Sequence, residues 1–229
     1  MSAKTKAVVG ALGLIAMTVS GCALTPGHVN VSYTPLGSSG TIRPAGAEAV
    51  SVHVAVSDQR ASKDAVGHKT NGYGMEMAPI TSDNDIPQTL QSAIESELKS
   101  HGFNIVEAGP TIAVALTKFE NRFVNGFWSG TATAELVMNV VVQRPDGGIV
   151  YTKLIDVQGV NPGIQLSSAE NAGIALDRAL QGGIAQLFED SAFPTALRTA
   201  GKNGAPATHA TDARVSPAAS HSPMTTESN

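Results

Sequence analysis

Only one of the 229 residues is a cysteine, Cys22, so the chain cannot close a disulfide within itself. A fold without disulfides must be held together by a packed apolar core. The six histidines show no spacing that is typical of metal ligands, and no second cysteine is present to assist them. We therefore expect neither a metal site nor a cofactor.

Charge is also scarce, because charged residues make up 15% of the chain and the net charge is −4 at pH 7. No basic stripe is present, which argues against nucleic acid as a partner. Catalytic motifs are missing as well. The serine in residues 126–130 stands one place too late for a G-x-S-x-G turn, and residues 71–74 lack the later glycine of a dinucleotide loop. We therefore expect no catalytic residues and a protein that is not an enzyme.

The one long apolar run lies at the N-terminus. Lys4 and Lys6 precede a largely apolar stretch over residues 7–19. This layout is typical of a secretory signal, and the stretch is too short to span a bilayer as a helix. No later segment of the sequence is long and apolar enough to be a spanning candidate.

The apolar run ends in the sequence VSGC at residues 19–22. This tetrapeptide resembles the bacterial lipobox, in which the leader is cut before the cysteine and the sulfur takes a diacylglycerol. The resemblance implies that residues 1–21 are a signal peptide and that lipidated Cys22 binds the membrane. In enterobacterial-type lipoproteins an Asp after the cysteine signals inner-membrane retention. Ala23 at that place implies the outer membrane, with the protein facing the periplasm.

The mature chain divides into three parts by composition. Residues 22–48 are rich in Pro, Gly, Ser and Thr and are expected to form a flexible, lipid-anchored tether. About 25 extended residues could lift the next part tens of ångströms from the lipid surface. Residues 49–198 contain the periodic apolar patterns of a single domain. Residues 199–229 contain almost no large apolar side chain and are expected to be a disordered tail.

Local patterns in the domain predict alternating strands and two amphipathic helices. The expected elements are a strand over 50–56, a helix from Pro87 to Gly102, a brief strand over 103–106, strands over 111–119, 131–142 and 149–157, a helix opened by Ser167 and Glu170, and a closing segment over 193–197. Asn125-Gly126 predicts a type I′ hairpin turn between two of the strands. The expected fold class is α+β, a two-layer sandwich in which an antiparallel sheet has two helices packed on one face.

At this level the chain resembles the YajG family of bacterial lipoproteins, which are small and largely uncharacterised. The resemblance covers about residues 8–198. It depends on the lipobox, on Asp58-Gln59-Arg60 after the first strand, on the helix over 90–102, on the hairpin, and on residues 187–190 before Phe193. The resemblance implies an outer-membrane lipoprotein and supplies no catalytic residues.

Two groups of residues are candidates for an interaction site. Asp58 and Arg60 either form a polar recognition patch or simply cap a turn and form an ion pair. The aromatic residues around the hairpin either pack beneath the loop or project from it and contact a partner or the bilayer. These aromatic residues are Phe119, Phe123, Phe127 and Trp128.

The leading functional hypothesis is a non-catalytic outer-membrane lipoprotein that binds another envelope component, whether protein, peptidoglycan or lipid. A second hypothesis is a carrier or sensor of a small apolar ligand held between sheet and helices, which requires a roomy apolar cavity. A third hypothesis is a periplasmic hydrolase, which requires His, Asp and Ser side chains that converge in a cleft.

Overall fold

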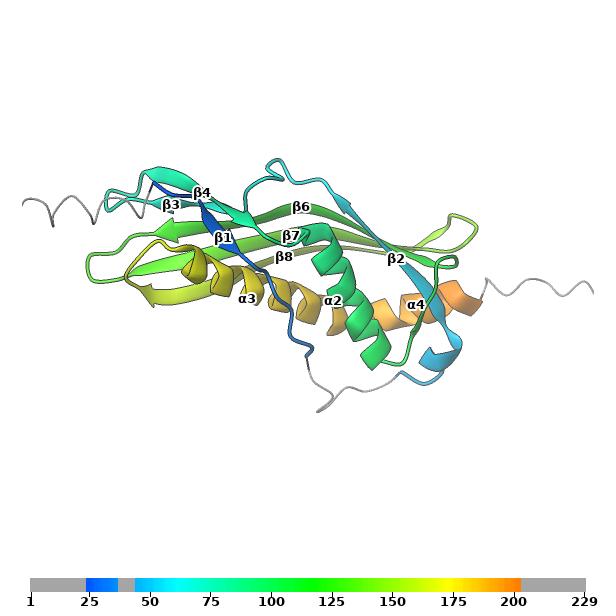
Figure 1. Cartoon of the computed structure of the whole chain (residues 1–229). Helices are drawn as coiled ribbons and strands as arrows, with labels where there is room; N and C mark the ends of the chain where they lie inside the picture. The colour runs from blue at the N-terminus through cyan, green and yellow to red at the C-terminus, as the bar shows by residue number, and fades with distance from the viewer. Residues whose placement is uncertain (1–23, 37–43, 203–229) are drawn as a thin grey trace, which may run out of the picture.

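The computed structural model describes residues 24–36 and 44–202 (Figure 1). The described residues form an eight-stranded sheet. Its strands are β1 (Gly27–Val29), β2 (Ser51–Asp58), β3 (Gly67–Thr70), β4 (Glu76–Ser82), β5 (Asn104–Ile105), β6 (Thr111–Val124), β7 (Gly130–Gln143) and β8 (Ile149–Ile164). The helices are the short 3₁₀ turn η2 (Ala47–Ala49), α2 (Ile86–Ser100), α3 (Ala169–Phe188) and α4 (Ala192–Lys202).

The sheet is mixed, so the α+β class is confirmed but the expected antiparallel sheet is wrong. Strands β6, β7 and β8 form the expected antiparallel meander. Strand β2, however, pairs in parallel with both β5 and β6, and β1 pairs in parallel with β4. The physical reason is connectivity, because the chain passes through helix α2 between β2 and β6. A helical crossover of this kind returns the chain in the same direction.

Helix α2 forms where the sequence predicts it. Asp85 caps its first turn by accepting a hydrogen bond from the Gln88 amide at 2.7 Å, and Pro87 occupies the first turn, where a missing N–H costs nothing. Its apolar stripe is fully buried. Helix α3 is capped by Ser168 rather than by the expected Ser167, and it runs to Phe188.

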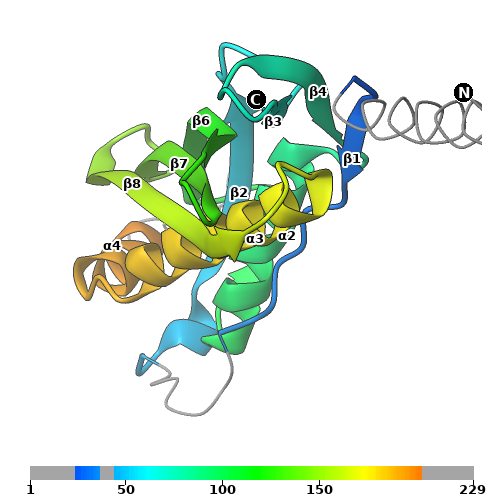
Figure 2. The same cartoon turned by 90° about the vertical axis from the view of Figure 1, so that its left-hand side faces the viewer.

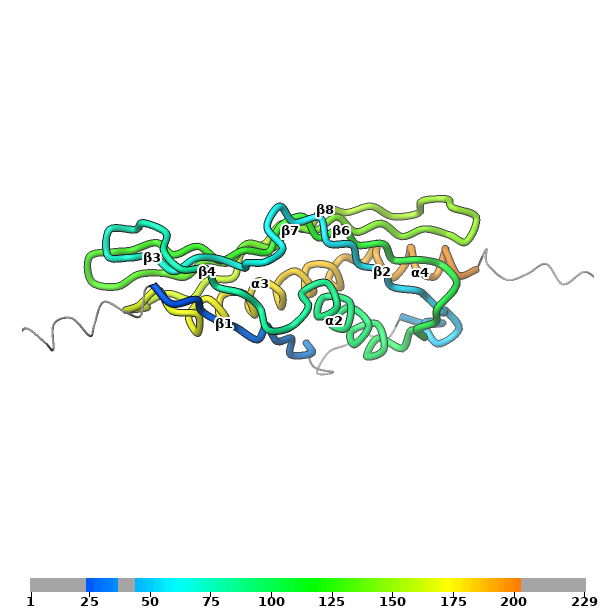
Figure 3. The backbone as a smooth tube through the Cα atoms, turned by 45° about the horizontal axis from the view of Figure 1, so that its top comes forward, coloured from blue at the N-terminus to red at the C-terminus, as the bar shows by residue number. Residues whose placement is uncertain are grey.

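A third helix, α4, occupies the region where only a short closing segment was expected. The helices lie on the same side of the sheet (Figure 3). The expected number of two helices on this face is therefore too low. Ala200 is fully buried and α4 extends to Lys202, so the folded domain does not end at residue 198. Residues 203–229 of the expected tail lie outside the described residues.

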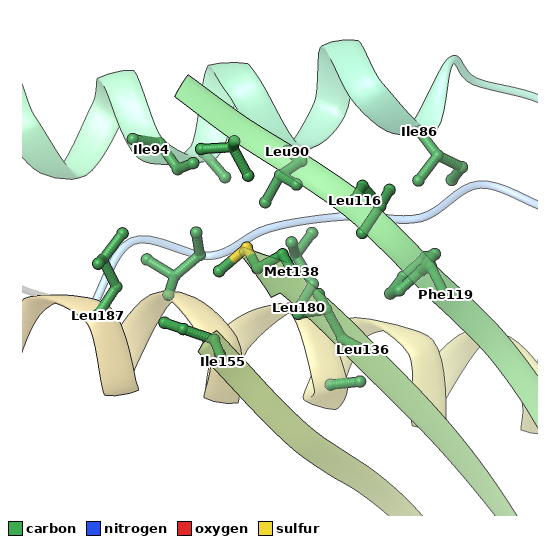
Figure 4. Close-up of a cluster of buried hydrophobic side chains, with 14 of the residues drawn as sticks. Ile86, Leu90, Ile94, Leu116, Phe119, Leu136, Met138, Ile155, Leu180 and Leu187 are labelled. Carbon is green, nitrogen blue, oxygen red and sulfur yellow. The ribbon is translucent and has the colours of Figure 1, made fainter. Parts of the chain in front are cut away.

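The core fills the space between the helices and one face of the sheet. Figure 4 shows Leu116, Leu136 and Met138 of the sheet pointing toward side chains of α2 and α3. Alternate residues of β7 from Ala132 to Val142 are buried, as their period of two predicts. Gly159 of β8 lies directly under α3, where an added Cβ would be 2.1 Å from a main-chain oxygen of the helix.

Part of the expected tether is folded onto this domain. Val29 and Val31 are buried in the core, and β1 joins the sheet beside β4. The Ser32 amide donates to Asp177 of α3 at 2.8 Å. The Tyr33 hydroxyl donates to Glu97 of α2 at 2.7 Å. The expectation of a free tether over 22–48 is therefore wrong for residues 27–36. Cys22 and the signal peptide lie outside the described residues.

Candidate functional site

Three loops lie together at one end of the molecule and form the candidate site, here called the loop end. It consists of residues 71–75 between β3 and β4, residues 125–129 between β6 and β7, and residues 165–168 between β8 and α3. Figure 1 shows these connections at the end where β1 begins. Large apolar side chains project from all three loops.

Hydrogen bonds join the three loops into one surface. The Asn125 side chain donates to the Asn71 carbonyl at 2.8 Å. The Gln165 side chain donates to the Trp128 carbonyl at 3.4 Å, which links the second loop to the third. A hollow of about 300 Å³ lies between the loops and is lined by residues of all three. The loop end is thus a connected surface rather than three independent turns.

Phe127 and Trp128 form the most exposed part of this surface. Phe127 is 91% exposed and Trp128 is 85% exposed. Their rings meet edge to face with centroids 4.8 Å apart, an arrangement that aromatic pairs favour. Gly126 permits the tight turn before them, because a Cβ there would be 2.3 Å from the Ser129 carbonyl oxygen. The pair therefore presents an apolar projection to the solvent.

The hairpin differs in detail from the prediction. The loop between β6 and β7 has five residues, 125–129, instead of a two-residue turn. Gly126 is not among the glycines with positive φ, so the expected type I′ turn is wrong.

Phe123, a candidate for the interaction surface, follows the packed alternative and is buried in the core together with Phe119. The reason is an irregularity in β6, where the pairing with β7 shifts between Leu116 and Lys118. An inserted residue reverses which positions face the core. Residues before the shift, such as Leu116, are buried at even positions, whereas Phe119 and Phe123 are buried at odd ones.

The structure adds three residues to the surface that the sequence did not indicate. Tyr73 is 91% exposed, Leu166 is 72% exposed and Met75 is 57% exposed. Asn71 shapes the first loop, because its side-chain oxygen accepts hydrogen bonds from the amides of Tyr73 and Met75. The available signal was the presence of large apolar residues within short loops that contain no charge.

Asp58 and Arg60 form a local ion pair. Two nitrogens of Arg60 contact the two carboxylate oxygens of Asp58 at 2.9 and 2.8 Å, and the Arg60 amide also donates to Asp58 at 3.1 Å. The Arg60 guanidinium holds the pKa of the Asp58 carboxyl below its usual range. The Arg60 side chain is only 5% exposed. This geometry matches the structural alternative, in which the two residues stabilise the end of β2.

The structure does not bring this ion pair to the loop end. Asp58 is paired with Leu116, whereas β6 reaches the loop end at Val124. Eight residues of strand correspond to roughly 25 Å. The two candidate groups are therefore separate features of the molecule.

The polar contacts of His28 do not have the geometry of a hydrolase relay. His28 contacts Asp83 at 3.2 Å and Thr81 at 3.1 Å, but both contacts are made by the same ring nitrogen, Nδ1. A proton relay needs the carboxylate and the hydroxyl on opposite ring nitrogens. Residues 24–36 and 44–202 also hold no group of three His, Cys, Asp or Glu side chains that could bind a metal ion.

A small cavity lies in the core between the sheet and helices α2 and α3. The cavity beside Leu90, Phe119 and Leu180 has a volume of about 10 Å³, whereas ligand sites usually measure about 300–1,000 Å³.

No helix within the described ranges has the length and apolarity needed to cross a membrane.

Comparison with known proteins adds family and fold. A family model described as "Uncharacterized lipoprotein" matches residues 41–198. No curated protein matches the chain. A crystal structure of a Xanthomonas campestris protein of the family DUF330 has 15% identity and a TM-score of 0.52, and the match covers 76% of this chain and 99% of that one. A minor lipoprotein from Acinetobacter baumannii has 8% identity and a TM-score of 0.37, with 61% and 93% covered.

The family match spans most of the folded domain and agrees with the resemblance to YajG proteins noted from the sequence. The Xanthomonas structure supports the fold alone, because its sequence identity is low. The chain therefore belongs to the family of uncharacterized lipoproteins whose model covers residues 41–198.

Proposed function

We propose that the mature protein is a non-catalytic lipoprotein that is anchored through Cys22 in the outer membrane, faces the periplasm and binds an envelope component through the loop end. The observation that carries this proposal is the lipobox at residues 19–22 in a chain of a lipoprotein family. Ala23 supports the outer membrane, because enterobacterial-type lipoproteins that are retained in the inner membrane usually have Asp at that place.

The loop end supports a binding role because it combines exposed apolar side chains with loops that are joined by hydrogen bonds. Phe127 and Trp128 are held against each other, and side-chain hydrogen bonds connect their loop to both neighbours. Exposed aromatic side chains bury a large apolar area when they contact a partner.

The two alternative functions are less well supported. The core cavity of about 10 Å³ between the sheet and helices α2 and α3 is too small to hold an apolar ligand, which argues against a carrier site at that place. The contacts of His28 with Asp83 and Thr81 do not form a relay, which argues against hydrolysis at that place.

Two measurements test the proposal in the native bacterium. Mass spectrometry of the mature protein should find an N-terminal Cys22 that carries diacylglycerol and an N-acyl chain, and density-gradient separation should recover it with outer membranes. A free thiol, an intact leader or recovery with inner membranes would contradict the anchoring proposal.

The binding role is tested with a photoreactive amino acid in place of Phe127 in living cells. The proposal predicts covalent adducts with an envelope lipid, glycan or protein from position 127. The same amino acid in place of the exposed Leu154 on β8 serves as the control. Equal adduct yields at both positions would show that the loop end has no special role.

A further inference from the structure

We propose that the loop end rests in the headgroup region of the bilayer that holds the lipid anchor, so that the partner of this surface is the membrane lipid itself. The inference depends on the lipid attachment at Cys22 proposed above and names the class of partner for the same surface. Three features support it: where the chain enters the domain, how little chain separates Cys22 from that point, and the chemistry of the surface.

The described chain begins at the loop end. Strand β1 runs parallel to β4 with Gly27 opposite Ile80, so the residues before Gly27 lie toward the start of β4. Lys69 of β3, which lies next to the first loop, donates to the Thr25 carbonyl at 2.9 Å. Figures 1 and 2 show β1 beside β4, toward the end of the sheet that carries the β3–β4 connection. The N-terminal entry and the exposed loops therefore share one end of the molecule.

Very little chain separates the anchor from this end. Cys22 precedes Leu24 by two residues, and a chain covers at most about 3.6 Å per residue. The lipidated sulfur must accordingly lie within roughly 10 Å of the Leu24 backbone. Residues 27–36 of the expected tether cannot act as a spacer between the anchor and the domain, because they are fixed to the sheet and helices. A lipid at Cys22 thus holds the loop end close to the bilayer.

The chemistry of the loop end suits a lipid interface. None of the three loops contains Asp, Glu, Lys, Arg or His. Trp and Tyr favour the boundary between headgroups and acyl chains, because their rings are apolar and their N–H or O–H groups remain hydrated. Each loop contributes a largely exposed side chain of this kind or an apolar one: Tyr73, Trp128 and Leu166.

The opposite end of the sheet has a different character. At the turn between β7 and β8, Arg144 contacts Asp146 at 3.1 Å. Charged groups of this kind are costly to bring into a lipid interface. The three loops of the loop end contain no such group, so they suit the lipid side better than this turn does.

The chain provides its own probe, because Trp128 is its only tryptophan. Full-length lipidated protein is reconstituted into vesicles of phosphatidylethanolamine and phosphatidylglycerol, some of which contain lipids brominated at defined acyl depths. We expect the Trp128 emission to shift to shorter wavelength and to be quenched most by bromine near the headgroups. Unshifted emission with no quenching in protein that floats with the vesicles would overturn the inference.

A relocated tryptophan provides the matched control. In the Trp128→Phe/Leu154→Trp variant, the single tryptophan stands on the open face of β8, ten residues from the end of that strand at Ile164. Ten residues of strand correspond to roughly 33 Å, so this tryptophan should not be quenched. Equal quenching in both proteins would place the whole sheet face on the lipid and overturn the inference.

The two proposals fail in distinguishable ways. Protein that lacks acyl chains by mass spectrometry and does not float would contradict the anchoring through Cys22. Protein that is acylated and floats, but whose Trp128 is not quenched, would contradict only the seating of the loop end. A loop end whose partner is another protein, which these vesicles lack, would give this second result.

Discussion

Glu97 connects the N-terminal segment to helix α2, and its removal tests whether that segment is fixed. The Glu97 side chain is 2% exposed. It accepts hydrogen bonds from the Tyr33 hydroxyl at 2.7 Å and from the Leu36 amide at 2.8 Å. Burial together with the Glu97 carboxylate raises the pKa of Tyr33 above its usual range, so the hydroxyl remains a donor at physiological pH. The change Glu97→Ala leaves both donors without their acceptor.

The expected loss follows from these two contacts. A hydrogen bond to a charged group contributes about 1.5–3 kcal/mol, so the pair contributes at most about 6 kcal/mol. The cost of burying the carboxylate opposes this gain. We therefore expect Glu97→Ala to lower the free energy of unfolding of the segment by about 3 kcal/mol. That change corresponds to an exchange rate about 100-fold higher for amides that become exposed when the segment opens.

Amide hydrogen exchange with mass spectrometry measures this effect on the peptide that covers residues 29–36. Glu95→Ala is the matched control, because Glu95 lies on the same helix and accepts a hydrogen bond from Gln91 within that helix. The control should leave exchange in residues 29–36 unchanged. If the Glu97→Ala variant exchanged as slowly as wild type in this segment, the reasoning that the carboxylate fixes it would be refuted.

Three further predictions concern the fold. Gly159→Ala should lower the free energy of unfolding by about 1–3 kcal/mol in urea titrations, since the new Cβ meets the α3 backbone. Gly182→Ala is the control and should not destabilise the fold, because an added Cβ there would be 4.0 Å from the side chain of Val157. Asp58→Asn should cost about 3 kcal/mol at pH 7 by leaving Arg60 unpaired. Because the pKa of Asp58 is lowered in the folded state, wild type should lose this advantage as the pH falls below about 4. Phe193→Ala should cost about 3–5 kcal/mol by thermal or chemical unfolding, because the ring is fully buried.

The antiparallel meander and helix α2 could be predicted because their patterns are local. Alternating apolar residues identify β7, and the stripe formed by Leu90, Ile94 and Leu98 identifies α2. The parallel pairing of β2 could not be predicted with the same certainty, since it depends on how α2 crosses over the sheet. The docked segment was missed for a related reason, because its partners Glu97 and Asp177 are far away in the sequence.

The loop end was only partly predictable. Phe127 and Trp128 were recognised because they follow Asn125-Gly126 in an otherwise aromatic-poor chain. Which of the four aromatic residues would be buried could not be predicted, because the burial of Phe119 and Phe123 depends on the register shift near Lys118. Tyr73 was not recognised because the loop that carries it joins the other two only through tertiary contacts such as that between Asn125 and Asn71.

Neutron reflectometry of the full-length lipidated protein on a supported bilayer tests the central claim most directly, because it measures the separation between lipid and protein. The docked N-terminal segment leaves only Ala23 between Cys22 and Leu24, so the protein density should begin within the headgroup layer with no water layer between them. A hydrated gap of tens of ångströms between the bilayer and the folded domain would contradict the account.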